Sequence, residues 1–274
     1  MAATGATTDL TFIHLTDLHL TATVDTHVNG QYPVHKLRQI LERIRAMEIK
    51  PAFLLITGDL VNDGQATEYQ MLNAMLRELQ SFGVPVLLGM GNHDARNPFR
   101  QVVLGEQVVD EQQPYYYSTE IAGVNVIVLD SQIPNEVPGR LDDEQLDWLA
   151  NELIKPVRVG HLIALHHPPV SSTVALLDTM VLTNPADLAA VVATHDTVLG
   201  ILSGHIHYNH VTRFQNTFSF TTPAVLYTID PGVQKNFRAL DGSGFAIGTV
   251  RNGQLFMNTV MMPGGETELV YRQL

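Results

Sequence analysis

The chain has 274 residues, no cysteine, and a formal net charge of −12 from 16 Lys and Arg against 28 Asp and Glu. Without cysteine it can form neither disulfide bonds nor thiolate metal sites, so any metal must be held by nitrogen and oxygen. The acidic charge argues against a nucleic-acid duplex as partner, and no apolar run reaches the roughly 18–20 residues of a membrane span. Since the N-terminus lacks a secretory signal, we expect a cytoplasmic protein.

The first ninety residues alternate between buried strands and amphipathic helices. Short apolar, β-branched runs predict strands at residues 10–16, 52–57 and 84–88. Apolar side chains at helical spacing predict helices over residues 34–47 and 66–82. This order favours parallel strands joined by right-handed crossovers, with ligands at the carboxyl ends of the strands.

The rest of the chain becomes richer in strands toward the C-terminus. After residue 90 we expect a hairpin at 115–120 and 124–130, a helix capped by Asp142, a strand at 161–165, a helix at 185–194 and a strand at 198–203. Strands are then expected at 218–222, 225–229, 245–250 and 254–261, with a type I′ turn at Asn252-Gly253 and a tail or edge segment at 263–274. Two mixed sheets packed face to face, with helices outside, accommodate this order. We expect a single domain over residues 1–274, with a core at about 10–212 and a portion at about 213–274 that completes the second sheet.

Five short segments that follow predicted strands end in residues typical of metal sites. They are Asp17-Leu18-His19, Gly58-Asp59, Gly91-Asn92-His93-Asp94, His166-His167-Pro168-Pro169 and Gly204-His205-Ile206-His207. Each segment alone would more often be an ordinary turn. Together they supply carboxylates, a neutral amide oxygen and imidazoles, which suits two divalent metals bound side by side.

The spacing within these segments suggests how they converge. Asp17 and His19 are two residues apart, as are His205 and His207. In an extended chain, residues i and i+2 face the same side, so we expect each pair to point into one site. Asp59 is the natural bridge, because a carboxylate can bind one metal with each oxygen or share one oxygen between two.

In this order, the five segments resemble the motifs of the calcineurin-like metallophosphoesterase superfamily, from Asp17 to His207. Within it, the chain most resembles the bacterial class III cyclic-nucleotide phosphodiesterase and glycerophosphodiesterase group. The resemblance implies a four-layer α/β/β/α sandwich of two mixed sheets flanked by helices, with a two-metal centre. One metal would be held by Asp17, His19, Asp59 and His207, and the other by Asp59, Asn92, His166 and His205.

The resemblance also implies roles for neighbouring residues. His166 is preferred to His167 as ligand, because the family's ligand lies two residues before the proline. His93 would lie above the metals and contact the phosphate or the leaving group. Asp94 would orient His93 or another histidine, or would be an exposed turn carboxylate.

The expected activity is hydrolysis of small phosphodiesters, such as 3′,5′-cyclic nucleotides or glycerophosphodiesters, by a metal-bound hydroxide. Two metals about 3.5–4 Å apart would activate the water and clamp the phosphoryl oxygens. Manganese, iron, cobalt and zinc all accept this donor set. A phosphomonoesterase or protein phosphatase on the same scaffold stays open, as does a non-catalytic interaction module. A homodimer is possible.

Overall fold

The computed structural model describes residues 9–107 and 110–272, and the expectations for the extreme N-terminus and the last two residues lie outside this part. A five-stranded mixed sheet lies on one side of the molecule, in the order β13-β12-β1-β2-β3. Its members are β1 (Leu10–Leu15), β2 (Leu54–Thr57), β3 (Val86–Gly89), β12 (Gly244–Arg251) and β13 (Gln254–Met261). β1, β2 and β3 run parallel, whereas β12 and β13 are antiparallel hairpin partners at the β1 edge.

A second mixed sheet has six strands, in the order β4-β5-β6-β7-β9-β8. Its members are β4 (Tyr117–Ile121), β5 (Val124–Val128), β6 (Gly160–Ala164), β7 (Val198–Ser203), β8 (His210–Phe214) and β9 (Thr217–Thr221). Its central strands β5, β6, β7 and β9 are parallel. Apolar side chains from both sheets form a common core, in which Phe12 and Phe53 of the first sheet lie with Val126 and Leu162 of the second.

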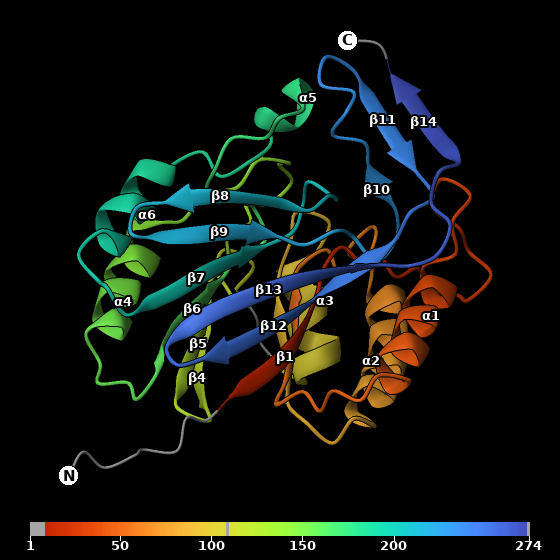
Figure 1. Ribbon diagram of the computed structural model, residues 1–274. Coiled ribbons are helices and arrows are strands. Elements are labelled where there is room, and N and C mark those ends of the chain that lie inside the picture. The colour runs from red at the N-terminus through yellow and green to blue at the C-terminus, as the bar shows by residue number, and fades with distance from the viewer. Residues whose placement is uncertain (1–8, 108–109, 273–274) are drawn as a thin grey trace.

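Helices cover the outer face of each sheet. α1 (Pro33–Arg45) and α2 (Ala66–Gln80) pack on the first sheet, and α4 (Asp143–Leu153) and α6 (Pro185–Val192) pack on the second (Figure 1). The short segments α3 (Arg96–Phe99), η1 (Arg100–Leu104) and α5 (Ala175–Asp178) lie in the connections. The predicted four-layer α/β/β/α sandwich is therefore confirmed. None of the helices in the described part is long and apolar enough to cross a membrane.

Local signals in the sequence set several element boundaries. The Asp142 side chain accepts a hydrogen bond from the backbone N–H of Gln145, 2.8 Å away, and so caps α4 as expected. Asn252 and Gly253 have φ values of 52° and 72°. Both residues of a type I′ turn require positive φ, so the predicted turn between β12 and β13 is confirmed.

The expectation that residues 213–274 complete the second sheet is wrong for most of them. Only β9, paired with β8, extends that sheet, whereas β12 and β13 extend the first. β10 (Thr228–Ile229), β11 (Phe237–Leu240) and β14 (Glu268–Arg272) form a separate three-stranded sheet, seen beside the C-terminus in Figure 1. Of the two alternatives for residues 263–274, a tail or an edge segment, the structure supports the second, because β14 is an edge strand of this small sheet.

Candidate metal centre

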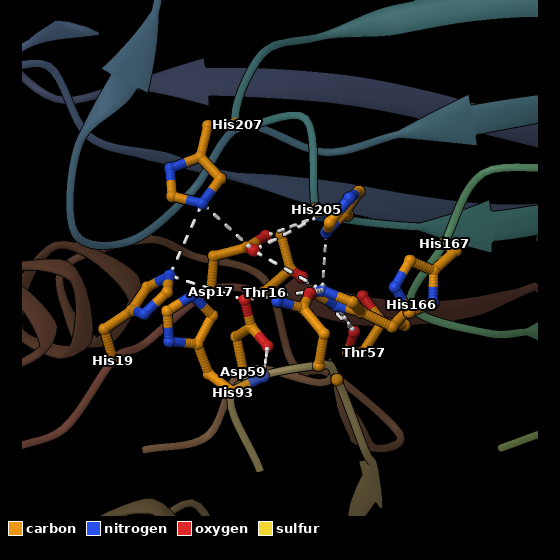
Figure 2. A network of polar contacts seen from close by, with 12 residues as sticks. Thr16, Asp17, His19, Thr57, Asp59, His93, His166, His167, His205 and His207 are labelled. Carbon is orange, nitrogen blue, oxygen red and sulfur yellow. Dashed lines mark hydrogen bonds and ion pairs between the residues drawn. The ribbon is translucent and has the colours of Figure 1, made fainter. Parts of the chain in front are cut away.

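The candidate ligands lie together at the carboxyl ends of five strands. Three of these strands belong to the first sheet and two to the second. The ligands follow β1, β2, β3, β6 and β7, and are Asp17, His19, Asp59, Asn92, His166, His205 and His207. Figure 2 shows the Asp17 and Asp59 carboxylates in the middle, with imidazoles on both sides. Backbone hydrogen bonds join the segments: His19 N–H donates to Asp59 O at 2.9 Å, and Gly204 N–H to His166 O at 3.0 Å.

One group of donors consists of Asp17, His19, Asp59 and His207, all buried. His207 Nε2 lies 3.2 Å from Asp17 Oδ1 and 3.4 Å from His19 Nε2. His19 Nε2 lies 3.6 Å from Asp59 Oδ2. Atoms bound to one cation at about 2.0–2.2 Å are separated by about 3–3.5 Å, so this spacing fits a shared metal ion.

A second group is centred on Nε2 of His166. This nitrogen lies 3.4 Å from Asp59 Oδ2, 3.2 Å from Asn92 Oδ1 and 3.2 Å from His205 Nδ1. Asp59 Oδ2 thus faces both groups, while Asp59 Oδ1 accepts the backbone N–H of His93 at 2.9 Å. Asp59 therefore lies between the two donor groups, and its role as a bridging ligand stays a prediction.

The remaining nitrogens of two ligands are held in the orientation that metal binding requires. His166 Nδ1 lies 2.8 Å from the carbonyl oxygen of Thr57, and His207 Nδ1 lies 2.9 Å from that of Tyr227. A carbonyl oxygen only accepts, so each Nδ1 carries a proton and each Nε2 is the nitrogen that faces a metal. Thr57 and Tyr227 were not predicted as site residues, because a backbone carbonyl leaves no signature in side-chain identity.

The protonation states of the centre follow from burial and from its carboxylates. Burial lowers the pKa of His19 to about 3, so this imidazole is neutral. Burial alone would also lower the pKa of His166, but the carboxylates of Asp59 and Asp17 outweigh it and raise that pKa to about 9. In turn, the imidazoles of His166 and His93 outweigh burial and hold the pKa of Asp59 well below its ordinary value. The donor set therefore fits divalent cations, which would replace the proton on His166.

The backbone at five of the seven candidate ligands is not extended. Asp17, His19, Asp59, His205 and His207 have φ values of 54°, 47°, 48°, 72° and 60°, in the left-handed region. The members of each i, i+2 pair do converge, but the extended geometry that we expected for them is wrong. Left-handed non-glycine residues cost roughly 1–3 kcal/mol each and persist only where the surrounding structure enforces them.

Two glycines permit the close approach of the ligand segments. Gly58 has a φ of +94°, and a Cβ there would lie 2.6 Å from the backbone nitrogen of Gly91. A Cβ on Gly91 would lie 2.2 Å from Asp59 Oδ1. Any larger residue at position 91 must therefore displace the carboxylate between the two donor groups.

His93 lies at the centre but is held by an unexpected partner. Its Nδ1 is 2.6 Å from the carbonyl oxygen of Asn62, so Nδ1 carries a proton and Nε2 is the nitrogen left for a substrate. Its ring meets the His19 ring edge-on, with centroids 4.6 Å apart. Burial lowers its pKa, but Asp59 and the Asn62 carbonyl outweigh that effect and raise it above the ordinary value. The Asn62 carbonyl thus orients His93.

Asp94 is buried, so the expectation of an exposed turn carboxylate is wrong. The expectation that it orients a histidine is wrong as well, because its oxygens have other partners. They accept hydrogen bonds from the N–H groups of Leu60, Val61 and Gly91 and from the Tyr69 hydroxyl, at 3.1, 3.3, 2.9 and 3.1 Å. Asp94 therefore ties the loop after β2 to the loop after β3 and positions Asp59 and Asn92 through the backbone.

His167 touches the centre but has its own partners. It lies with His166 and His205 in a group that could hold a metal. However, its Nδ1 is 2.8 Å from Ser131 Oγ and its Nε2 is 2.9 Å from the Val137 carbonyl oxygen. Both nitrogens are engaged, which favours His166 as the ligand.

A cavity of about 400 Å³ opens beside the donors. Its lining includes His19, Asp59, Asn92, His93, His205 and His207. Tyr227 also lines it, with its ring 4.6 Å from that of His207. Cavities of roughly 300–1,000 Å³ hold small-molecule ligands, so a substrate of this class can reach the centre.

Comparison with known proteins agrees with this geometry. The profile of the calcineurin-like phosphoesterase family matches residues 10–209, from β1 to just beyond His207. The chain belongs to this family. A probable cyclic nucleotide phosphodiesterase of Rhodococcus erythropolis is 35% identical to this phosphoesterase over 223 residues, which cover 81% of this chain and 73% of the relative.

Two further proteins are similar to this phosphoesterase. A cAMP/cGMP dual specificity phosphodiesterase of Mycobacterium tuberculosis is 31% identical, over 94% of this chain and 81% of the relative. Among solved structures, a dimetal phosphatase from Danio rerio superposes with a TM-score of 0.62 at 15% identity, over 90% of this chain and 98% of the other. The last similarity supports the fold alone.

Proposed function

We propose that this phosphoesterase hydrolyses small phosphodiesters, such as 3′,5′-cyclic nucleotides or glycerophosphodiesters, with two divalent metal ions bound. The observation that carries the proposal is the position of Asp59 Oδ2, 3.6 Å from His19 Nε2 and 3.4 Å from His166 Nε2. One carboxylate oxygen thus faces two donor groups. The names of the two bacterial relatives support cyclic nucleotides as substrates.

The two donor groups define the proposed metal sites. One ion would be held by Asp17, His19, Asp59 and His207, and the other by Asp59, Asn92, His166 and His205. When bound, the ions would polarise the phosphoryl oxygens and lower the pKa of a water molecule. Manganese, iron, cobalt and zinc are all candidates, because nitrogen and oxygen donors accept each of them.

His93 supplies the proposed acid. Because Asn62 holds the Nδ1–H, His93 presents Nε2 to the cavity that it lines. Asp59 favours the protonated imidazole, so Nε2 can donate a hydrogen bond to a phosphoryl oxygen or a proton to the leaving oxygen. Asn62 and Asp94 act on this step only by positioning the residues that touch the substrate.

The charge of the cavity favours a diester over a monoester. A diester carries one negative charge, whereas a monoester carries close to two at neutral pH. Among the described lining residues, Arg272 is the only Lys or Arg. This lining gives less support to protein phosphatase activity. A purely non-catalytic role is also less well supported, because every expected ligand position is filled by a donor.

Hydrolysis of matched substrates tests the proposal. The purified enzyme, loaded in turn with Mn²⁺, Fe²⁺, Co²⁺ or Zn²⁺, is assayed with bis(4-nitrophenyl) phosphate, 4-nitrophenyl phosphate and cyclic AMP. We expect the diesters to have the higher kcat/KM. Faster cleavage of the monoester would favour a phosphomonoesterase, and no cleavage by a protein with two bound metals would contradict catalysis altogether.

Three further expectations from the sequence belong to the same proposal. We propose that residues 1–274 form one metallophosphoesterase domain and that the protein acts in the cytoplasm. A homodimer stays a prediction, for which the mass in solution is the direct measurement.

A further inference from the structure

The cavity beside the metal centre has two unlike sides. We call one side the metal floor: His19, Asp59, Asn92, His93, His205 and His207. We call the other side the apolar wall: Leu176, Leu177, Met180, Ile229, Phe237 and Val270. Attack on a phosphate requires no apolar side chains. The wall therefore offers a surface for the part of the substrate that does not react.

The wall is a built surface with a fixed position relative to the floor. Leu177 and Ile229 are buried in one cluster, against which Met180 and Phe237 pack. The backbone N–H of Ala175 donates to the Gln234 carbonyl at 2.9 Å, which ties α5 to the segment between β10 and β11. The carbonyl oxygen of Tyr227 accepts a hydrogen bond from His207, and Tyr227 directly precedes β10, the strand that carries Ile229.

Strand pairing places a cation beside the aromatic residue of the wall. In the antiparallel pair of β11 and β14, Phe237 is the direct partner of Arg272. Directly opposed residues project from the same face of a sheet, as do residues two apart on one strand, such as Val270 and Arg272. Phe237, Val270 and Arg272 accordingly all line the cavity. The wall thus combines an aromatic ring, aliphatic side chains and one guanidinium group.

This combination discriminates between the two substrate classes of the proposed function. A nucleobase offers two flat faces that stack on aromatic rings and edge atoms that accept hydrogen bonds from a guanidinium group. A glycerol group would lose water at an apolar surface without gaining hydrogen-bond partners there. A choline or ethanolamine group carries a positive charge, which the guanidinium group of Arg272 would repel.

We infer that the apolar wall and Arg272 form a nucleobase subsite, which makes nucleoside 3′,5′-cyclic phosphates the preferred substrate class over glycerophosphodiesters. The inference rests on the proposed function, since it concerns the same cavity. Phe237 supplies the stacking surface, and Arg272 supplies hydrogen-bond donors and excludes cationic headgroups. These residues determine specificity and take no part in the bond-breaking step.

A comparison of two substrates and three variants tests the subsite. The Mn²⁺-loaded enzyme is assayed with cyclic AMP and with glycerophosphocholine. Phe237→Ala should lower the ratio of the two kcat/KM values about tenfold, through a higher KM for cyclic AMP, as expected for the loss of one stacking contact. Arg272→Glu should lower the same ratio, because glycerophosphocholine gains an attractive charge. Phe256→Ala is the matched control, since Phe256 is 48% exposed on β13 and does not line the cavity.

The possible results separate the subsite from the proposed function. A ratio within twofold of wild type in both Phe237→Ala and Arg272→Glu would overturn the subsite while leaving phosphodiester hydrolysis in place. Arg272 is exposed, so its variant keeps the test valid even if Phe237→Ala unfolds at a lower temperature. A metal-loaded wild-type enzyme that cleaves neither diester would contradict the proposed function itself, and the subsite with it.

Discussion

The metal floor and the apolar wall face the same cavity but are held in place by different interactions. The floor follows parallel strands of both large sheets, and its segments are joined by backbone hydrogen bonds such as that from His19 N–H to Asp59 O. The wall comes from short elements: β10 has two residues and α5 has four. Side-chain packing around Leu177 and Ile229 holds it together.

This difference separates the reaction from the choice of substrate. The floor has a strained backbone and little free space, so small changes there displace donors that must meet at one point. The wall relies on apolar contact, which tolerates a change of side-chain shape at constant volume at a modest cost. We therefore expect floor variants to affect every substrate and wall variants to affect some substrates more than others.

Replacing the shared carboxylate should have the largest effect. Asp59→Ala removes the oxygen that faces both donor groups, so we expect loss of bound metal and a fall in kcat of at least about a thousandfold on every diester. Metal content by mass spectrometry and steady-state kinetics would measure this. Asp147→Asn, on the exposed face of α4, is the control for loss of one carboxylate. An Asp59→Ala enzyme with full metal content would contradict the bridging assignment.

Removing the proposed acid should slow the reaction without emptying the centre. His93→Ala should lower kcat about 10²- to 10⁴-fold, the range for loss of a general acid. Both metals should stay bound, because His93 is outside the two donor groups. Asn92→Ala, in contrast, should weaken the binding of one metal. Loss of both metals from His93→Ala would show that His93 is itself a ligand.

A methyl group at Gly91 should damage the floor through space alone. The new Cβ would lie 2.2 Å from Asp59 Oδ1, so the carboxylate must move. We expect Gly91→Ala to lower kcat about a hundredfold and stability by about 1–3 kcal/mol, as for overpacking of a filled site. Gly89→Ala is the matched control on β3, because its nearest contact would be an ordinary 3.4 Å. Equal kinetics of the two variants would contradict the close approach.

Metal affinity should rise with pH. Asp59 and Asp17 raise the pKa of His166 from 6.5 to about 9 against the effect of burial, so the metal-free protein keeps a proton there at neutral pH. This proton stabilises the metal-free fold fully below pH 6.5, and its contribution is lost as pH rises through about 9. A metal must displace it, so the apparent affinity should increase about tenfold per pH unit up to that pH. Calorimetric titration in buffers of different ionisation enthalpy would count the released proton.

A change in the buried cluster that supports the apolar wall should have the smallest effect on the rate of hydrolysis. Val174→Ala removes buried methyl groups from the cluster that supports Leu177 and Ile229. We expect a loss of about 1–3 kcal/mol of stability, with metal content unchanged. Thermal unfolding and metal analysis on one sample would measure both. A loss of metal from this variant would show that floor and wall are coupled more tightly than their contacts indicate.

The residues of the metal floor could be predicted from the sequence because they follow strands with a clear apolar pattern. β7 (Val198–Ser203), the strand that precedes His205 and His207, has the predicted bounds. These donors were identified by the chemistry of their side chains, although the extended backbone that we expected at them was wrong. The partners Asn62 and Tyr227 escaped prediction, because they act through carbonyl oxygens that every residue has.

The residues of the apolar wall could not be predicted from the sequence in the same way. β11 and β14 pair across about thirty residues, and neither alternates clearly between apolar and polar side chains. Phe237 of β11 packs against a cluster formed by Leu177 of α5 and Ile206 of the loop after β7, which lie far from it in the sequence. Of the three strands in this small sheet, only β10 lies within a predicted strand, residues 225–229, and β11 was not predicted. The sheet to which each strand belongs depends on tertiary packing.

The left-handed backbone at Asp17, His19, Asp59, His205 and His207 restricts which amino acids these positions can accommodate. Apart from glycine, that conformation is adopted most readily by Asn, Asp and His. The same residue types bind hard and borderline cations. An exchange for glutamate or a β-branched residue would therefore conflict with the main chain even where its side chain could coordinate. Far fewer amino acids are therefore available for changing the metal preference of this centre than coordination chemistry alone would suggest.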